Sequence, residues 1–444
     1  MADRRFRHMK RAFVVAAAIG VSACNDIPGD QENERLSITN NMLSLQQRVS
    51  YPEQTLAIDG AAGVLPRPAA ARIANAKGNG VIRFKVNAAR DATPALPLRL
   101  VAEISPPLVE GEAVQATSVA MARSKTAVVS YNMRGAPRLG AIDLVTFSRV
   151  TNPQLLTSVV FKDSDINAVT VDKRYVYAAV ATNSPDFATP AVLEKIKLKK
   201  SRLVLEDNTR VQLSSYAATS AERAEDVIFA TSGDGGHLVA FERSKKSFDK
   251  LAEFPLDDAR WVSWDEDGGR VVVAQGTPGR ISVFDEAVQP DGSLLLLNSF
   301  AFPGANVPES KSTVEIAGDK AFIAAGPEGV QILCLDDGQV LGNVPIPDPA
   351  SLGLDPSVVV TNSVTVDDDL MFISNGEAGV YVAQASQEFE DTGCNTPMNI
   401  TLLGKLQFGN LQSANHVAYK GKYLFVAAGL GGIKVVRMDI DDDD

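Results

Sequence analysis

Histidine is almost missing from this chain, which has three in 444 residues. One of them, His8, lies in the N-terminal leader described below, so a Ser-His-Asp triad would have to use His237 or His416. The three cysteines cannot build a closed structural zinc site without help from histidine. No P-loop, dinucleotide-binding glycine motif, zinc-protease helix or nucleophile elbow is present. The sequence therefore offers no motif of a common enzyme class.

Positive charge is also in short supply. Acidic residues outnumber basic ones by 54 to 43, and the formal net charge is -11. The first 23 residues hold five basic side chains and one acid, so the remainder is more acidic still. Such a body repels nucleic acid phosphates and anionic membrane surfaces. We expect no nucleic acid partner, and any membrane attachment has to be covalent or protein-mediated.

Long apolar runs are absent, but a short one lies near the N-terminus. Residues 12–21 are apolar or small and follow Lys10-Arg11, and a run of this length cannot span a bilayer. It ends in Val21-Ser22-Ala23-Cys24, which resembles the lipobox of bacterial lipoproteins. The resemblance implies that residues 1–23 are a signal peptide and that Cys24 becomes the acylated N-terminus. The alternative is an ordinary signal peptide with a chance cysteine.

The residues after the lipobox predict where the protein resides. Several acyl chains, palmitate among them, give stable anchoring where one chain is marginal. The residue after the cysteine is Asn25 and not aspartate, which in lipoproteins favours the outer membrane. Residues 24–55 are polar and predict a lipidated tether, with one short helix over 37–47. The last residues, 439–444, form an acidic tail.

Between these ends, residues 56–438 repeat one pattern with a period of about 50 residues, in the range of propeller blades. Each copy has a strand, a polar turn, an apolar strand, a glycine turn and a further strand. Four copies start near Val119, Val169, Ala217 and Val262, and three more start at 312, 363 and 416.

The pattern predicts an all-β propeller with four-stranded antiparallel blades. The second strand of each copy is continuously apolar, which indicates burial on both faces, as between two neighbouring blades. Turn glycines such as Gly326, Gly376 and Gly429 suit tight hairpins. The last copy lacks a fourth strand, and residues 98–104 are expected to supply it beside residues 433–436, closing the ring. Residues 80–84 resemble a further third strand, so seven blades are expected and eight stay open.

These repeats resemble the LVIVD-repeat family of bacterial and archaeal surface propellers. The similarity lies in the V-x-V strand, the polar turn, the aromatic-hydrophobic-Ala strand and the G-x-x-G-V turn, over residues 80–440. The resemblance implies a propeller at the cell surface and says little about activity.

Asparagine recurs at one place in the repeats. Asn167, Asn362 and Asn415 with His416 begin innermost strands, and these points gather near the mouth of a propeller channel. A ring of amides there could bind a small polar ligand or a cation. The alternative is that each asparagine bonds the backbone of its own loop.

Cys334 and Cys394 lie one blade apart, and the oxidising envelope favours a disulfide between them, with two unpaired thiols as the alternative. No cofactor is indicated; besides the ring of amides, the acidic tail at 439–444 is a second place to consider for weak Ca²⁺ binding.

The leading functional hypothesis is an envelope lipoprotein that binds a protein or polysaccharide as a scaffold, facing the periplasm or the cell surface. The alternative is a carboxylate- or metal-dependent hydrolase or lyase with its site at the channel mouth, which predicts titratable groups around His416 with perturbed pKa values. A third is a structural spacer without a pocket or an exposed apolar patch.

Overall fold

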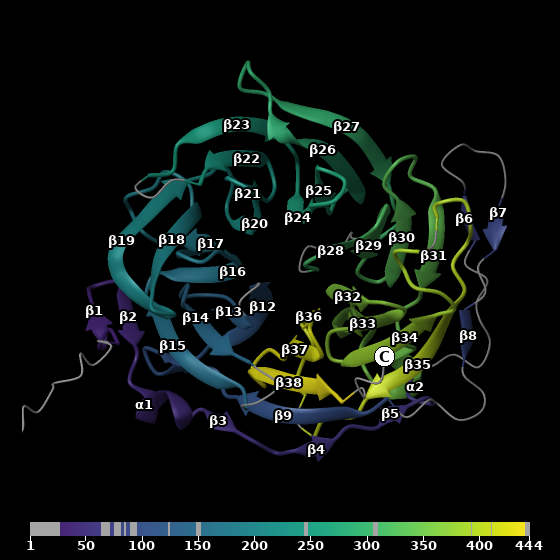
Figure 1. Cartoon of the computed structure of the whole chain (residues 1–444), viewed down its shortest axis with the longest axis horizontal. Helices are drawn as coiled ribbons and strands as arrows, with labels where there is room; N and C mark the ends of the chain where they lie inside the picture. The colour runs from purple at the N-terminus through teal and green to yellow at the C-terminus, as the bar shows by residue number, and fades with distance from the viewer. Residues whose placement is uncertain are drawn as a thin grey trace, which may run out of the picture.

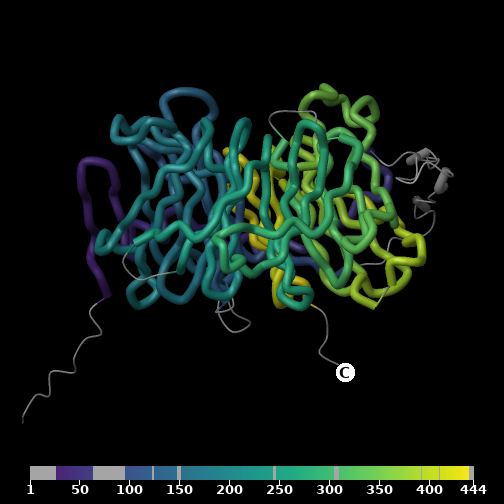
Figure 2. Tube along the Cα trace, turned by 90° about the horizontal axis from the view of Figure 1, so that it is seen from above, coloured from purple at the N-terminus to yellow at the C-terminus, as the bar shows by residue number. Residues whose placement is uncertain are grey.

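The computed structural model describes residues 27–63, 96–122, 125–147, 152–243, 247–304, 310–391, 393–409 and 411–439, and gives backbone alone for three short strands between 72 and 88. Viewed down its shortest axis, the described chain forms a ring of seven blades (Figure 1). Seen from the edge, it is wider than it is thick (Figure 2).

Each blade is an antiparallel sheet whose strands run in sequence order from the central channel to the rim. Six blades take all four strands from consecutive segments: blade 1, β12 (Gln115–Ala122), β13 (Thr126–Asn132), β14 (Gly140–Thr146) and β15 (Gln154–Phe161); blade 2, β16 (Ser164–Val171), β17 (Tyr175–Thr182), β18 (Ala191–Lys199) and β19 (Arg202–Gln212); blade 3, β20 (Ala218–Ala224), β21 (Val227–Ser232), β22 (His237–Glu242) and β23 (Lys250–Pro255); blade 4, β24 (Ala259–Asp265), β25 (Arg270–Gln275), β26 (Arg280–Val288) and β27 (Leu294–Ala301); blade 5, β28 (Val314–Ala317), β29 (Lys320–Ala324), β30 (Val330–Cys334) and β31 (Val340–Val344); blade 6, β32 (Ser363–Asp367), β33 (Leu370–Ser374), β34 (Val380–Ala385) and β35 (Ile400–Leu406).

Blade 7 closes the ring as the sequence predicted. Its inner strands are β36 (His416–Lys420), β37 (Tyr423–Ala427) and β38 (Ile433–Met438), and its fourth is β9 (Leu98–Ile104). β9 pairs antiparallel with β38, with Ile104 opposite Ile433 and Leu100 opposite Val436. The two ends of the repeat region therefore pair in one sheet, and every blade of the closed ring packs against two neighbours.

The hydrophobic core consists of seven clusters, one between each pair of neighbouring blades. Second strands lie between two such clusters, and β17, β29, β33 and β37 are buried along their whole length. This confirms that the continuous apolar segments are covered on both faces.

Three glycine turns also join blades. Gly326, Gly376 and Gly429 have φ of 57°, 57° and 58°. Each makes a β-bridge to the segment that enters the next blade, at Thr361, Ala414 and Ala116 respectively. At Gly376 an added Cβ would clash with the backbone oxygen of Val358. The turn therefore needs glycine for its left-handed backbone and for close approach to the neighbouring segment.

Residues 27–63 run along the outside of three blades. This N-terminal strap contains β1 (Gln31–Glu32), β2 (Leu36–Thr39), α1 (Met42–Gln46), β3 (Val49–Ser50), β4 (Gln54–Thr55) and β5 (Ile58–Asp59). β2 pairs with β15 of blade 1, β3 and β4 pair with β9 of blade 7, and β5 pairs with β35 of blade 6. The strap thus covers three adjoining outer edges, at the lower side of Figure 1.

The polar tether predicted over 24–55 is instead a segment paired with the blades in its described part, from Ile27 onward. Although the strap is polar overall, Leu36, Ile38, Leu45 and Leu56 are buried and join the clusters between blades. The helix expected over 37–47 is shorter, because residues 37–39 belong to β2. Here pairing with an open sheet edge outweighs local sequence preference.

The remaining elements lie outside the blades: β6 (Arg72–Ala74), β7 (Val81–Arg83), β8 (Val86–Ala88), β10 (Leu108–Val109), β11 (Glu112–Ala113), α2 (Pro349–Leu352) and the 3₁₀ helix η1 (Pro356–Val358). β7 pairs with β6 alone, and β8 runs parallel to β35 on the rim. β7 and β8 therefore add no eighth blade; residues 80 and 84 of the segment 80–84 lie outside the described residues.

Buried ion pairs fasten the strap to the blades. Arg48 Nη1 donates to Asp143 Oδ1 at 3.1 Å, and Tyr131 Oη donates to Asp143 Oδ2 at 2.8 Å. Arg35 pairs in the same way with Glu194, and neither the Asp143 nor the Glu194 side chain has exposed surface. Burial raises the pKa of Glu194 above its ordinary value, and the charge of Arg35 opposes that shift.

We expect Arg48→Met to lower the free energy of unfolding by about 3–5 kcal/mol, because it leaves Asp143 buried without its counter-charge. The matched control is Arg99→Met, whose partners Glu53 and Asp439 lie at the surface, and its cost should stay below about 1 kcal/mol. Urea denaturation of both variants measures the difference. Equal losses would show that Arg48 does not fasten the strap.

Candidate functional site

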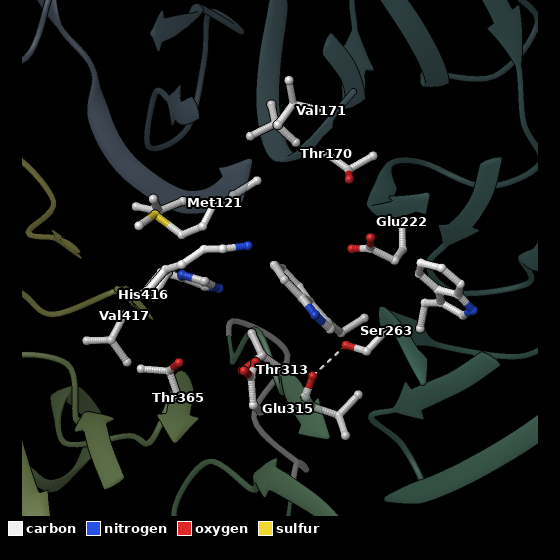
Figure 3. A pocket seen from close by; sticks show the side chains of 18 of the residues that line it. Met121, Thr170, Val171, Glu222, Ser263, Thr313, Glu315, Thr365, His416 and Val417 are labelled. Atoms are coloured by element: carbon white, nitrogen blue, oxygen red, sulfur yellow. Dashed lines mark hydrogen bonds between the residues drawn. The ribbon is translucent and has the colours of Figure 1, made fainter. Parts of the chain in front are cut away.

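A cavity of about 350 Å³ occupies the centre of the ring (Figure 3). Residues of all seven innermost strands line it, from β12, β16, β20, β24, β28, β32 and β36. Every blade thus brings the same edge to one central site.

The three predicted asparagines lie at one end of this channel, where they join blades. The side-chain Nδ2 of Asn167 donates to the carbonyl of Ala218 at 2.8 Å. Asn415 donates to Ala116 at 2.9 Å, and Asn362 lies 3.5 Å from the carbonyl of Ala414. Each acceptor belongs to the next blade. The amide nitrogens therefore bridge neighbouring blades, a contact that the sequence did not predict.

Other side chains at the start of the innermost strands form the same bridge. Thr117 donates to the carbonyl of Ile166 at 3.1 Å and Thr219 to that of Ala259 at 2.7 Å. β-Bulges fall at Thr117, Asn167 and Thr219, so one extra residue in the strand turns its side chain toward the neighbouring blade.

His416 follows the bridging Asn415 in sequence and contacts a residue from the opposite side of the channel. Its imidazole and the indole of Trp261, three blades away, have centroids 5.2 Å apart and planes inclined by 32°. His416 is 6% exposed, and its Nδ1 has no hydrogen-bond partner in the part of the chain that the structure describes. Burial lowers the pKa of His416 to about 3, and the nearby charge of Lys311 adds to the effect, so the ring is neutral.

Lys311 crosses the channel in the same region. It precedes β28 of blade 5, and its Nζ donates to the backbone carbonyl of Asn167 in blade 2 at 2.9 Å. Burial lowers the pKa of Lys311 to about 7. The Lys311 side chain and the contact between Trp261 and His416 together narrow this end of the channel.

One layer further along, the seven strands contribute the residues that follow their buried valine or alanine: Ala120, Thr170, Glu222, Ser263, Glu315, Thr365 and Ala418. Several of these side chains are bonded: Ser263 donates to the carbonyl of Val314 at 2.6 Å, and Glu222 accepts from the hydroxyl of Thr170. Glu315 receives no hydrogen bond from the described residues.

The two glutamates face a cavity yet are surrounded by protein. Burial raises the pKa of Glu222 to about 7, and burial together with the like charge of Glu222 raises the pKa of Glu315 to about 8. Sequence reasoning missed both residues. The available signal was that they occupy one equivalent position in two repeat copies.

Within the described ranges, no three His, Cys, Asp or Glu side chains gather closely enough to hold a metal ion. Asp439 pairs with Arg437 and Arg99, and the rest of the acidic tail lies outside those ranges. Cys24 also lies outside them.

The remaining cysteines, Cys334 at the end of β30 and Cys394 in the loop after β34, form a disulfide with Cα atoms 5.6 Å apart. It links blade 5 to the loop of blade 6.

A second unusual surface lies on the rim. In β27, Leu295, Leu296 and Leu297 are between 37% and 46% exposed, and Leu251 of the adjoining β23 is 37% exposed. β27 is the outer strand of blade 4, and no described strand pairs with its free edge. It lies across the ring from the strap (Figure 1).

No protein-family model and no curated protein matches this sequence. Solved structures with a similar chain include the computationally designed Ika8 protein, at 11% identity over 74% of this chain and 98% of that one, with a TM-score of 0.44. Another is the WD40 β-propeller domain of Doa1, at 12% identity over 76% and 96%, with a TM-score of 0.48. The blade count rests on the strand pairing of this chain. No described helix is long and apolar enough to cross a membrane.

We expect the stability of the protein to fall as the pH rises through neutrality, and Glu315→Gln to remove part of that fall. The pKa of Glu315 is 4.5 without the fold and about 8 within it, so between these values the native state holds a proton that the unfolded chain has lost. Relative to wild type, Glu315→Gln should gain about 3 kcal/mol of unfolding free energy between pH 5 and pH 8.

Urea denaturation at pH 5, 6.5 and 8 measures this change. Glu377→Gln, at an exposed turn, is the control and should differ from wild type equally at each pH. A difference for Glu315→Gln that stays constant over the range would contradict the assignment.

Proposed function

We propose that this protein is a lipid-anchored envelope scaffold that binds a partner protein through the open edge of blade 4. A β-propeller fits a binding module in general, because a rigid ring presents broad surfaces for recognition. The observation that carries the finer proposal is the exposed leucine strand β27, unpaired by any described strand and located opposite the strap.

The anchor supports the orientation. Cys24 precedes the first described residue, Ile27, by three positions, a reach of about 10 Å in extended chain. Because the strap is paired with blades 1, 7 and 6, an acylated Cys24 would hold the ring close to the membrane by that side. Blade 4 would then point away from it. The lipobox, Asn25 and the LVIVD-like repeats favour the outer membrane.

The strap itself shows how an outer edge takes up a partner. β2 adds to β15 of blade 1 as an antiparallel strand and buries Leu36 and Ile38. β27 offers the same open backbone edge with exposed leucines beside it. We therefore infer that the partner contributes an extended segment with apolar side chains, by strand addition. Within our wider proposal of a protein or glycan ligand, this surface favours protein.

The other candidate function, a carboxylate-dependent hydrolase or lyase, has one observation in its favour. Glu222 and Glu315 share the central cavity, and their pKa values of about 7 and about 8 suit proton transfer near neutrality. The described residues give no such support to the metal-dependent version. Loss of turnover in Glu315→Gln, with a candidate glycan or lactone as substrate, would favour this function.

Cys24→Ser should release the protein from the membrane, because serine has no thiol to take up a diacylglyceryl group as a thioether. In the native host, the wild type is expected in the detergent-extracted membrane fraction and to carry label from an alkynyl fatty acid. Cys394→Ser is the control and should stay in the membrane fraction. Membrane retention and labelling of Cys24→Ser would contradict lipid anchoring.

A photo-crosslinking residue at Leu297 should give one discrete adduct with another envelope protein in intact cells. The matched control is the same residue at Leu430, which is equally exposed at 44% in a turn of blade 7 and should give no such adduct. Leu295→Asp should weaken the adduct at 297 at least tenfold, because a charge at the edge disfavours strand addition. Equal adducts at both sites, or an adduct with a second copy of this chain, would contradict the proposal.

A further inference from the structure

The central cavity has basic groups toward one end and carboxyl groups further along, and the proposed site on the rim involves neither. His416 lines the cavity toward one end, with Lys311 close to it, and the carboxyl groups of Glu222 and Glu315 line the cavity further along the innermost strands (Figure 3). At about 350 Å³ it falls in the size range of small-molecule sites.

Among the described residues, no basic side chain forms an ion pair with either glutamate. The charge of Arg223 lowers the pKa of Glu222, and the backbone N–H of Arg223 donates to Glu222 Oε1 at 3.0 Å, but burial outweighs both effects. Within the described ranges, the charge that acts on Glu315 is the like charge of Glu222. Two carboxyl groups in one enclosed layer, one of them without a hydrogen-bond donor, form a site for a group that brings positive charge and N–H donors.

Among the described residues, no carboxylate forms an ion pair with Lys311 near the opposite end. Lys311 is held across the channel by a neutral carbonyl oxygen and lies close enough to His416 to lower its pKa. His416 lines the cavity, is more than nine-tenths buried, and leaves Nδ1 unpartnered among the described residues. A polar atom so placed points to a ligand, because buried nitrogen atoms rarely go without a partner.

The spacing of these groups excludes a single ion as their common ligand. Glu222, Glu315 and His416 all line one cavity, yet no three such side chains among the described residues come close enough to share a metal ion. A ligand that meets both parts must therefore be an extended molecule.

We propose that the channel binds a small zwitterionic amine, with its ammonium group between Glu222 and Glu315 and its acidic group toward His416 and Lys311. The remaining charged groups of the cavity, Arg223, Glu266 and Lys420, line its other end and belong to the entrance, since Glu266 and Lys420 are exposed. The indole of Trp261 supplies an aromatic surface along the ligand. This site is independent of a partner at blade 4.

The ω-amino acids with two to five methylene groups form a suitable series of probes, because their two charges are separated by a known and increasing length. Isothermal titration calorimetry and thermal unfolding of the purified protein should detect binding that is tightest for one chain length. The n-alkylamine and the alkanoic acid of that length should each bind at least tenfold more weakly, because each lacks one charge.

Two variants test the placement of the ammonium group. Glu315→Gln and Glu222→Gln should each weaken the best probe at least tenfold, whereas Glu377→Gln at an exposed turn should bind as wild type does. Binding at pH 7 should also release protons to the buffer, since an ammonium ion favours the ionised form of Glu315. Titrations in buffers of different ionisation enthalpy measure that release.

Lys311→Met tests the other end, and should weaken the amino acid while leaving the weaker alkylamine unchanged. The proposal is overturned if no probe of the series binds at millimolar concentration, or if the glutamine variants bind the best probe as wild type does. In the wild type, Lys311 takes up part of the released protons, because an acidic group beside it raises its pKa from about 7. The proposal is therefore equally overturned if binding to Lys311→Met releases no protons. Where one glutamine variant does not fold, the second variant and the proton release on Lys311→Met decide the outcome.

Discussion

The fold depends on burial of each blade between two others. A single blade has two apolar faces and cannot cover either alone, so its second strand is stable only when the ring is complete. This is why β9 and β38, which lie at opposite ends of the repeat region, must meet. Burial of apolar surface does not by itself fix how two blades are aligned. The hydrogen bonds from Asn167, Asn415 and Thr117 to the next blade do so, because they join specific atoms.

The rim differs from the core, because the outer strand of each blade leaves one backbone edge without a partner from its own blade. On three blades the strap pairs with that edge, and it is fixed by Arg35 and Arg48 in buried ion pairs. Most outer strands can remain open safely when they are polar or short. β27 is neither, since four leucines in a row begin it. An exposed edge of that kind would carry a risk of aggregation unless something covers it, which is why we assign it to a partner.

The repeat period and the burial of the second strands could be predicted from sequence because both are local patterns repeated seven times. Closure by β9 could be predicted because one strand was missing at the end and one was unassigned at the beginning. The strap could not be predicted, because its alternating Leu36 and Ile38 become meaningful only beside the edge of β15, more than a hundred residues away. The disulfide between Cys334 and Cys394 could be predicted only in part, because the spacing of the cysteines and an oxidising compartment allow it but do not require it.

In the channel, sequence could select His416 but not its surroundings. Trp261 and His416 meet because they lie three blades apart in a ring of seven, and Lys311 reaches Asn167 for the same reason. No distance along the chain signals such contacts. The glutamates were more accessible, because at that layer the other blades carry alanine, serine or threonine. Burial makes Glu222 and Glu315 hard to ionise, and Lys311 hard to protonate, so each lowers stability at some pH. Replacement by the small residues of the other blades would remove that cost. A ring that needed only to close would therefore gain nothing from these charged residues. A ligand that brings the opposite charges to both ends would offset these costs when it binds, and this coupling links the channel to function.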